Sequence, residues 1–132
     1  MFTSNMLMSH GTPPGQFATS SAQQWVVPAN ITSICAVAIG NGGPGTEDGA
    51  GGGGGLSYTN NIAVTPFETL SIDFNTGLAR LLRGVATLLA AENGSPAGAT
   101  VGPGGQATNG VGDVKNSGGD GGDREQGSLG GG

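Results

Sequence analysis

Two glycine-containing motifs match patterns that bind ligands in other proteins, so they are the first candidates for chemistry. Residues 40–45, Gly-Asn-Gly-Gly-Pro-Gly, fit the G-x-G-x-x-G pattern of dinucleotide-binding loops. In such a loop a helix begins within the glycines, and its N-terminal amides face the pyrophosphate. Pro44 and the glycine block at residues 51–55 exclude that helix. We therefore predict a structural loop here and no nucleotide.

The second motif suggests calcium. Residues 118–123, Gly-Gly-Asp-Gly-Gly-Asp, match the start of the nonapeptide repeat that binds Ca²⁺ in β-rolls. However, Glu125 stands where the repeat needs an apolar residue, and the repeat occurs once, whereas stacked repeats complete each site. We predict a solvated acidic turn, with calcium at residues 118–123 as the alternative, and no cofactor or metal elsewhere.

Catalytic residues are scarce. His10 is the single histidine, and it lies in a polar segment remote in sequence from any candidate nucleophile. No pair of carboxylates is flanked by apolar residues that would raise a pKa for acid–base catalysis. Cys35 lies within an apolar run and is predicted to be a buried, inert side chain. The sequence predicts a protein that is not an enzyme.

Composition limits the partners. The 132 residues carry a net charge of −5, and 10% of them are charged. Nucleic-acid binding requires clustered Lys and Arg, so we predict no nucleic-acid partner. Residues 1–10 contain no Lys or Arg and no continuous apolar stretch, and no segment approaches the length of a membrane span. We expect neither a secretory signal nor membrane insertion.

Hydrophobic patterning predicts a small all-β domain at residues 16–92. Residues 33–39 form a short apolar run typical of a strand covered on both faces. Residues 56–64 are expected to place Leu56, Tyr58, Ile62 and Val64 on one face, with a bulge at the adjacent asparagines, residues 60–61. Residues 69–74 alternate strictly between apolar and polar.

Residues 78–92 allow two interpretations. Their leucines and Val85 fall at helical spacing, which favours a helix. The strands predicted around them favour a hairpin instead, with residues 80–83 and 86–91 on either side of Gly84 and Val85.

Glycine-rich and proline-containing segments flank this domain. Residues 1–15 form an N-terminal arm that ends in Thr-Pro-Pro-Gly. Residues 93–132 contain too few apolar side chains for a core. They suit extended three-fold helices whose backbones bond to one another, and a flexible linker-like tail is the alternative.

The order of motifs in residues 16–74 resembles the glycine-rich domain of bacteriophage tail-fibre and other virion proteins. The likeness rests on Trp25-Val26-Val27-Pro28, on the polyglycine loop, and on the run from Tyr58 through Asn60-Asn61 to Val64-Thr65-Pro66. The chain departs from the family at Phe67, where glycine is usual. The resemblance implies strands in residues 78–92 and, overall, a β-sandwich or jelly-roll-like fold with polyglycine loops.

The resemblance also implies a function: a structural protein located in the virion, in a tail fibre or tail tip, that attaches to the host surface. A capsid decoration or cement protein is the alternative, and a free carbohydrate-binding module is a third. Because loops carry function on a rigid β scaffold, the candidate recognition residues in the glycine loop are Asn41, Glu47 and Asp48. Tyr58, an aromatic residue of the strand that could stack on a sugar or belong to the core, is the fourth candidate.

The expected partners are copies of this chain, as a homotrimer or larger assembly, and other virion proteins. A host-surface glycan or protein is the expected external ligand. A proline-containing arm gains order mainly by binding, so the candidate assembly contacts are Phe2, Met6, Leu7, Pro13 and Pro14.

Overall fold

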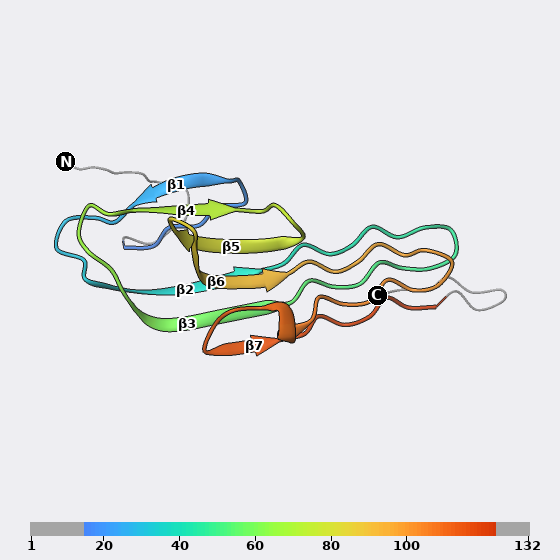
Figure 1. Cartoon of the computed structure of the whole chain (residues 1–132). Coiled ribbons are helices and arrows are strands. Elements are labelled where there is room, and N and C mark those ends of the chain that lie inside the picture. The colour runs from blue at the N-terminus through green and yellow to red at the C-terminus, as the bar shows by residue number, and fades with distance from the viewer. Residues whose placement is uncertain (1–14, 124–132) are drawn as a thin grey trace.

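The chain forms a two-sheet β-sandwich from which a bundle of extended glycine-rich segments projects (Figure 1). The computed structural model describes residues 15–123. The predicted assembly contacts Phe2, Met6, Leu7, Pro13 and Pro14 therefore lie outside the described residues, as do residues 124–132. Within the described residues, no helix is long and apolar enough to cross a membrane.

One sheet has the strand order β1-β4-β5-β6, and the other has the order β2-β3-β7. All pairings within the two sheets are antiparallel. The strand bounds are β1 Gln23–Val26, β2 Ser33–Ile39, β3 Leu56–Ala63, β4 Thr69–Asp73, β5 Leu78–Arg83, β6 Ala86–Glu92 and β7 Val114–Asn116, and a 3-10 helix, η1, spans Ala107–Asn109. The all-β prediction is confirmed.

The apolar core lies between the two sheets, where β2 and β3 pack against β6. Leu70 and Val27 are 0% exposed at its centre, and Trp25 packs against it while stacking on Phe17 with ring centroids 6.1 Å apart. The buried core residues are Val27, Ala38, Ile62, Val64, Leu70, Ala79, Leu81, Leu89 and Ala91.

Residues 78–92 form a hairpin, so the interpretation as strands is confirmed. β5 and β6 pair in antiparallel register, with Leu78 opposite Glu92 and Arg83 opposite Ala86. Gly84 adopts a φ of +59° in the turn between them, a conformation that glycine tolerates better than other residues. The helical spacing of the leucines is a coincidence, because alternate residues of β5 and β6 face the core.

The predicted bulge in β3 is confirmed, and it corrects the predicted face of that strand. Ile34 pairs with Ile62 and Ala36 with Thr59, so residues 60 and 61 of β3 both stand opposite Cys35. Asn61 takes the left-handed conformation, with φ +59°. The extra residue changes which face the side chains occupy.

As a result, Ile62 faces the core, whereas Leu56 and Tyr58 lie on the outer face with the exposed Val37 and Ile39. The buried position in this half of β3 belongs to Ser57, which is 1% exposed. The prediction that Leu56, Tyr58, Ile62 and Val64 share one face is therefore wrong.

The prediction for Cys35 is also wrong, because its side chain is exposed. The run from residue 33 to 39 suggested a strand covered on both faces. In the structure Ile34, Ala36 and Ala38 face the core, while the alternate residues face outward and no described element covers them.

The turn after β3 places Phe67 in a conformation that glycine usually supplies. Its φ is +67°, and its side chain is 69% exposed. The turn is held by two backbone hydrogen bonds of 2.8 and 3.1 Å, from the Phe67 amide to the Val27 carbonyl and from the Glu68 amide to the Thr65 carbonyl. A bulky side chain in this region carries backbone strain, because a left-handed φ is adopted readily only by glycine.

Two ion pairs brace the β1-β4-β5-β6 sheet. Arg80 and Asp73 are joined at 2.7 Å, and Arg83 and Glu68 at 2.9 Å. The hydrogen bonds from Arg83 and then from the Thr65 amide lower the pKa of Glu68, and the hydrogen bond from Arg80 is the main cause that lowers the pKa of Asp73.

These lowered pKa values predict an acid-sensitive fold. A carboxylate whose pKa is lower in the folded state stabilises the fold above its unfolded pKa and loses that contribution as pH falls through the folded pKa. We expect the melting temperature to fall as pH drops below the ordinary values of 4.5 for Glu68 and 3.8 for Asp73. In Glu68→Gln, which keeps an acceptor for the Thr65 amide, the fall between pH 5 and 3 (roughly the carboxylate range) should be smaller. An identical pH profile for the two proteins would contradict this assignment.

Candidate functional site

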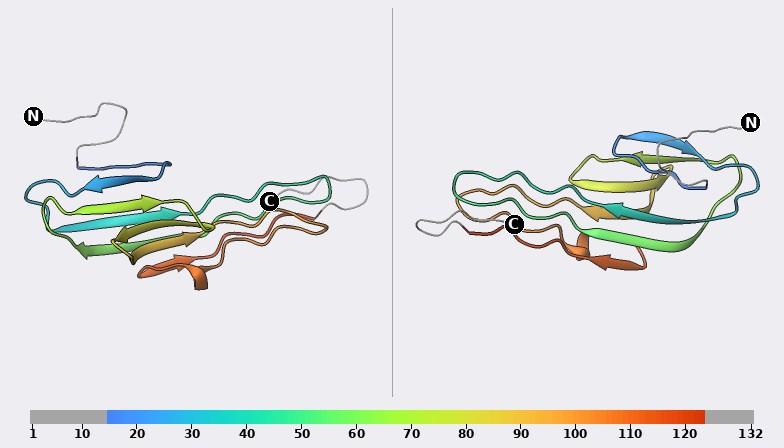
Figure 2. Two further views of the ribbon diagram at one scale, coloured as in Figure 1. Left: turned by 45° about the horizontal axis from the view of Figure 1, so that its top comes forward. Right: turned by 180° about the vertical axis from the view of Figure 1, so that it is seen from behind.

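The glycine loop between β2 and β3 and the glycine-rich region after β6 form one bundle (Figures 1 and 2). The chain enters this bundle from the sandwich, turns at the far end and returns. It is built from five extended segments joined by backbone hydrogen bonds: residues 40–45, 50–55, 93–98, 101–106 and 117–122.

Residues 50–55 form the central segment, which bonds to each of the other four. The distances lie between 2.8 and 3.2 Å. The donor and acceptor pairs are Gly40 to Gly55, Gly43 to Gly52, Gly52 to Ser95, Gly55 to Glu92, Gly53 to Gly119, Ala50 to Gly122, Gly102 to Ala50 and Gly105 to Gly53. Partners recur every third residue, the periodicity of the polyproline II helix. The prediction that extended glycine segments bond to one another through their backbones covers residues 93–132. Such hydrogen bonds are present through residue 122, and residues 40–55 also take part in them.

Glycine is required because the backbones lie in contact. An ideal Cβ would stand 1.9 Å from the Gly43 carbonyl oxygen at Gly51, 2.1 Å from the Pro103 oxygen at Gly52, and 1.8 Å from the Gly40 oxygen at Gly54. Several positions of the central segment therefore require glycine, because neighbouring backbones contact this segment on more than one side. An outer segment meets the bundle on fewer sides, and residues 117–122 accommodate Asp120 on an exposed position.

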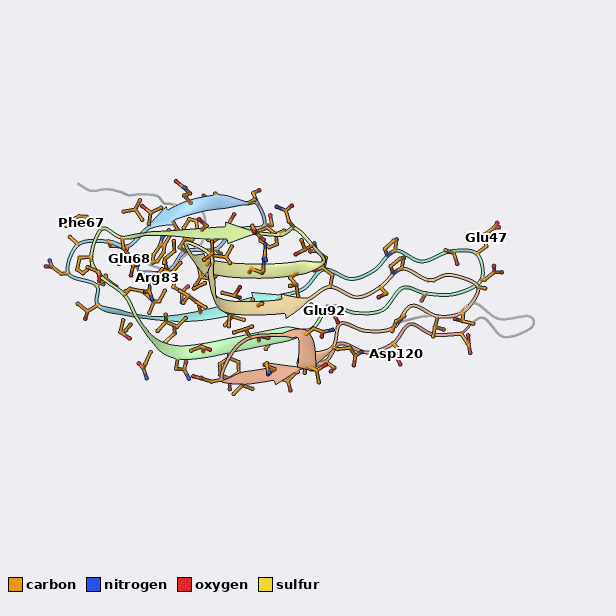
Figure 3. The ribbon with its side chains drawn as sticks, viewed as in Figure 1. Glu47, Phe67, Glu68, Arg83, Glu92 and Asp120 are labelled. Atoms are coloured by element: carbon orange, nitrogen blue, oxygen red, sulfur yellow. The ribbon has the colours of Figure 1, made fainter. Side chains whose placement is uncertain are left out.

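Glu92 fastens the bundle to the sandwich where β6 ends (Figure 3). Its carbonyl accepts a hydrogen bond from the Gly55 amide at 2.8 Å. Its carboxylate accepts from the Gln106 amide and from the Asn109 side chain, both at 2.6 Å. These contacts fix the direction in which the bundle leaves the sandwich.

Two loops are displayed at the far end of the bundle, and we call residues 45–49 and 98–101 the tip. Within the first loop the Thr46 amide donates to the Gly49 carbonyl at 2.8 Å, and within the second the Gly98 amide donates to the Thr100 carbonyl at 3.0 Å. The Thr46 hydroxyl joins the loops by donating to the Gly98 carbonyl at 3.4 Å. Residue 123 closes the tip through a bridge with Gly49.

The tip is exposed, polar and acidic. Glu47, Asp48 and Asp123 are exposed carboxylates, and Figure 3 shows Glu47 at the far end of the bundle as the described residues form it. Thr46, Ala99 and Thr100 are also exposed beside them. Backbone groups and small side chains dominate this surface, which can form hydrogen bonds with a polar ligand.

Of the predicted recognition residues, the structure brings together Glu47 and Asp48. Asn41 lies near the sandwich, where its amide donates to the Asn93 side chain at 2.9 Å and its carbonyl accepts from Gly94 at 2.8 Å. Tyr58 lies on the outer face of the β2-β3-β7 sheet, opposite Val37. Sequence reasoning missed the loop at 98–101, because no motif marks it; its place at the tip follows from the backbone hydrogen bonds of the segments on either side of it.

The two ligand motifs have structural roles. Residues 40–45 are extended, so no helix begins among their glycines, and their amides bond to neighbouring segments. In the second motif, the Asp120 carboxylate accepts the Gly104 amide at 2.8 Å. Among residues 15–123, no three His, Cys, Asp or Glu side chains gather where they could hold a metal ion.

Comparison of this chain with protein family models, with curated proteins and with solved structures finds no match.

Proposed function

We propose that this protein is a non-enzymatic structural component of a bacteriophage virion, in the tail fibre or tail tip, and that its tip contacts the host surface. The observation that carries this proposal is the display of two exposed loops on a bundle whose backbones bond to one another. Such a scaffold holds loops of variable sequence in a fixed arrangement. This is expected of a recognition module, in which a rigid framework supports the loops that bind the ligand.

The composition of the tip limits the chemical class of the ligand that can bind there. Exposed carboxylates at Asp48 and Asp123 disfavour strongly anionic surface polymers and favour neutral or cationic groups. Hydroxyl and amide groups beside them can bond to a glycan or to a polar protein loop. The motifs in residues 16–74 that resemble phage virion proteins support the same assignment.

Immunogold labelling of intact particles that contain this chain, with the copy number measured on the same preparation, tests the location. We expect label on the tail at few copies. Dense label over the head would instead support a capsid decoration protein, and particles without label would overturn the virion assignment.

Particles that carry Ala99→Lys test the tip itself. Ala99 is exposed in the loop at 98–101, so a long cationic side chain there should obstruct the ligand without disturbing the fold. We expect adsorption to host cells to slow at least about tenfold, the factor that 1.4 kcal/mol of binding free energy gives.

Val85→Lys is the matched control, because Val85 is fully exposed in the β5–β6 turn, at the end of that hairpin away from Glu92, where the bundle begins. This variant should adsorb like the wild type. Equal adsorption rates for Ala99→Lys and the wild type would place the ligand contact away from the tip.

A further inference from the structure

Among residues 15–123, no strand pairs with the outer edge of β2, which leaves a row of its backbone groups without a partner in that part of the chain. In the order β2-β3-β7, β2 has a neighbour on one side. The Gly40 amide bonds to the Gly55 carbonyl, and the register continues through Ala38 opposite Ser57 and Ala36 opposite Thr59. In an antiparallel pair alternate residues turn their N–H and C=O away from the partner strand. In β2 these are residues 35, 37 and 39.

The same three residues present apolar side chains to solvent. Val37 is 63% exposed, Ile39 is 61% exposed, and Cys35 is exposed. The strand contains no charged residue, in a chain whose net charge is −5. The apolar surface continues across the sheet through the half-buried Tyr58, opposite Val37.

The other described sheet edges are blunted in ways that β2 is not. β1 has four residues, β7 has three and includes Lys115, and β6 is covered by the bridge between Ala90 and Val111. Short length, charge and coverage are the devices by which soluble proteins prevent edge pairing. β2 has seven residues and lacks all three devices, since the bulge beside it lies in β3.

We propose that β2 is a self-association site, at which it pairs in antiparallel fashion with β2 of a second copy of this chain about a two-fold axis at Val37. This register places Val37 opposite its counterpart and Cys35 opposite the second copy's Ile39. Each free amide of one β2 edge then donates a hydrogen bond to a free carbonyl of the other β2 edge. The pairing joins the two three-stranded sheets into one continuous sheet.

A second copy fits this edge better than a charged partner does. The edge is uncharged, so two acidic molecules can approach there without placing like charges opposite each other. A two-fold axis uses the same patch on both molecules and closes the assembly at a dimer. Because β2 runs toward the bundle in each copy, the two tips point in opposite directions. The proposal does not depend on the virion assignment.

Cross-linking tests the register directly. In a hydrogen-bonded antiparallel pair, opposed Cα atoms are about 5.5 Å apart, within the range that a disulfide spans. In Ile39→Cys, the native Cys35 of each copy should bond to the new thiol of the other, and mild oxidation should give a covalent dimer on a non-reducing gel. Within one chain the two thiols are about 13 Å apart along the strand, too far to bond.

Wild-type protein is the matched control for cross-linking, because Cys35 lies opposite Ile39 rather than opposite its own counterpart. We expect no covalent dimer from it. Failure of Ile39→Cys to cross-link while it remains folded by circular dichroism would overturn the proposal, as would equal cross-linking of the wild type.

Val37→Pro tests the hydrogen bonding. Proline removes an amide hydrogen that makes no bond within the monomer, and edge strands accept proline at such positions. Sedimentation equilibrium should give the wild type twice the chain mass of 12.7 kDa and Val37→Pro the monomer mass. Val37→Thr keeps both the shape and the amide, so it should remain a dimer.

At about 100 µM protein, tenfold above a dissociation constant of about 10 µM, a wild type that sediments as a monomer would overturn the proposal. A Val37→Pro variant that sediments as a dimer would also overturn it. If Val37→Pro does not fold, Ile39→Lys provides the same comparison through charge, since it places a lysine opposite Cys35 of the second copy.

Discussion

Gly54→Ala is expected to open the glycine bundle while the sandwich stays folded. An ideal Cβ at this position would lie 1.8 Å from the carbonyl oxygen of Gly40. Backbone lies on both sides of the clash, so neither partner can rotate away, as a flexible side chain could. We expect the bundle to lose about 3 kcal/mol of stability, the upper end of the range for overpacked interiors.

Amide hydrogen exchange separates the two parts of the molecule. In Gly54→Ala the amides of Gly52 and Gly105, which bond across the bundle, should exchange faster, whereas those that pair β5 with β6 should stay protected. Gly119→Ala is the matched control, because a Cβ there meets nothing within 4 Å. Equal losses in the two variants would show that close backbone contact is not the reason for glycine in the central segment.

The strands could be predicted from the sequence where apolar residues form a continuous run or alternate regularly with polar ones. β2 was predicted with its observed bounds, Ser33–Ile39, and β4 to within one residue of its end. The hairpin at residues 78–92 needed more than periodicity, because the leucines of β5 and β6 also fall at helical spacing. Turn chemistry at Gly84 and the neighbouring strands favoured the hairpin, which is the outcome.

Tertiary packing, and not the local sequence pattern, determines which faces of β2 and β3 are buried. The apolar run of β2 has the composition of a strand buried on both faces, yet the sheet order leaves Cys35, Val37 and Ile39 uncovered. The single extra residue at Asn60–Asn61 moved Leu56 and Tyr58 to the outer face. Neither outcome can be read from one sequence, because both depend on which elements pack together.

Only part of the tip could be predicted from the sequence, again because its composition depends on which segments pack together. Glu47 and Asp48 were selected because they lie at the polar end of a glycine loop, and they lie at the tip. Asn41 was selected from the same loop, but the segment from residue 93 runs beside it and engages it near the sandwich. Sequence shows the three-residue glycine period but not which segments share an interior, and it therefore did not bring residues 98–101 to the tip.

Leu70→Ala is expected to destabilise the whole molecule, in contrast to Gly54→Ala. Leu70 is 0% exposed in the core between the sheets, and removing most of its side chain leaves a cavity. Leucine-to-alanine changes at such sites cost about 3 kcal/mol. At this chain length that loss corresponds to a fall in melting temperature of roughly 10 °C.

The bundle should be lost together with the sandwich in this variant, because the bundle has no apolar core of its own. Its segments are held by backbone hydrogen bonds, each of which contributes about 1 kcal/mol net and must offset the ordering of glycine. The Glu92 contacts that anchor it depend on β6. In Leu70→Ala, exchange at Gly52 and Gly105 should therefore quicken together with exchange in β5 and β6. Val85→Ala, a truncation at a fully exposed side chain, should leave both unchanged. If bundle amides stayed protected while those of β5 and β6 opened, the bundle would be an independently stable unit, and the sandwich would not be its foundation.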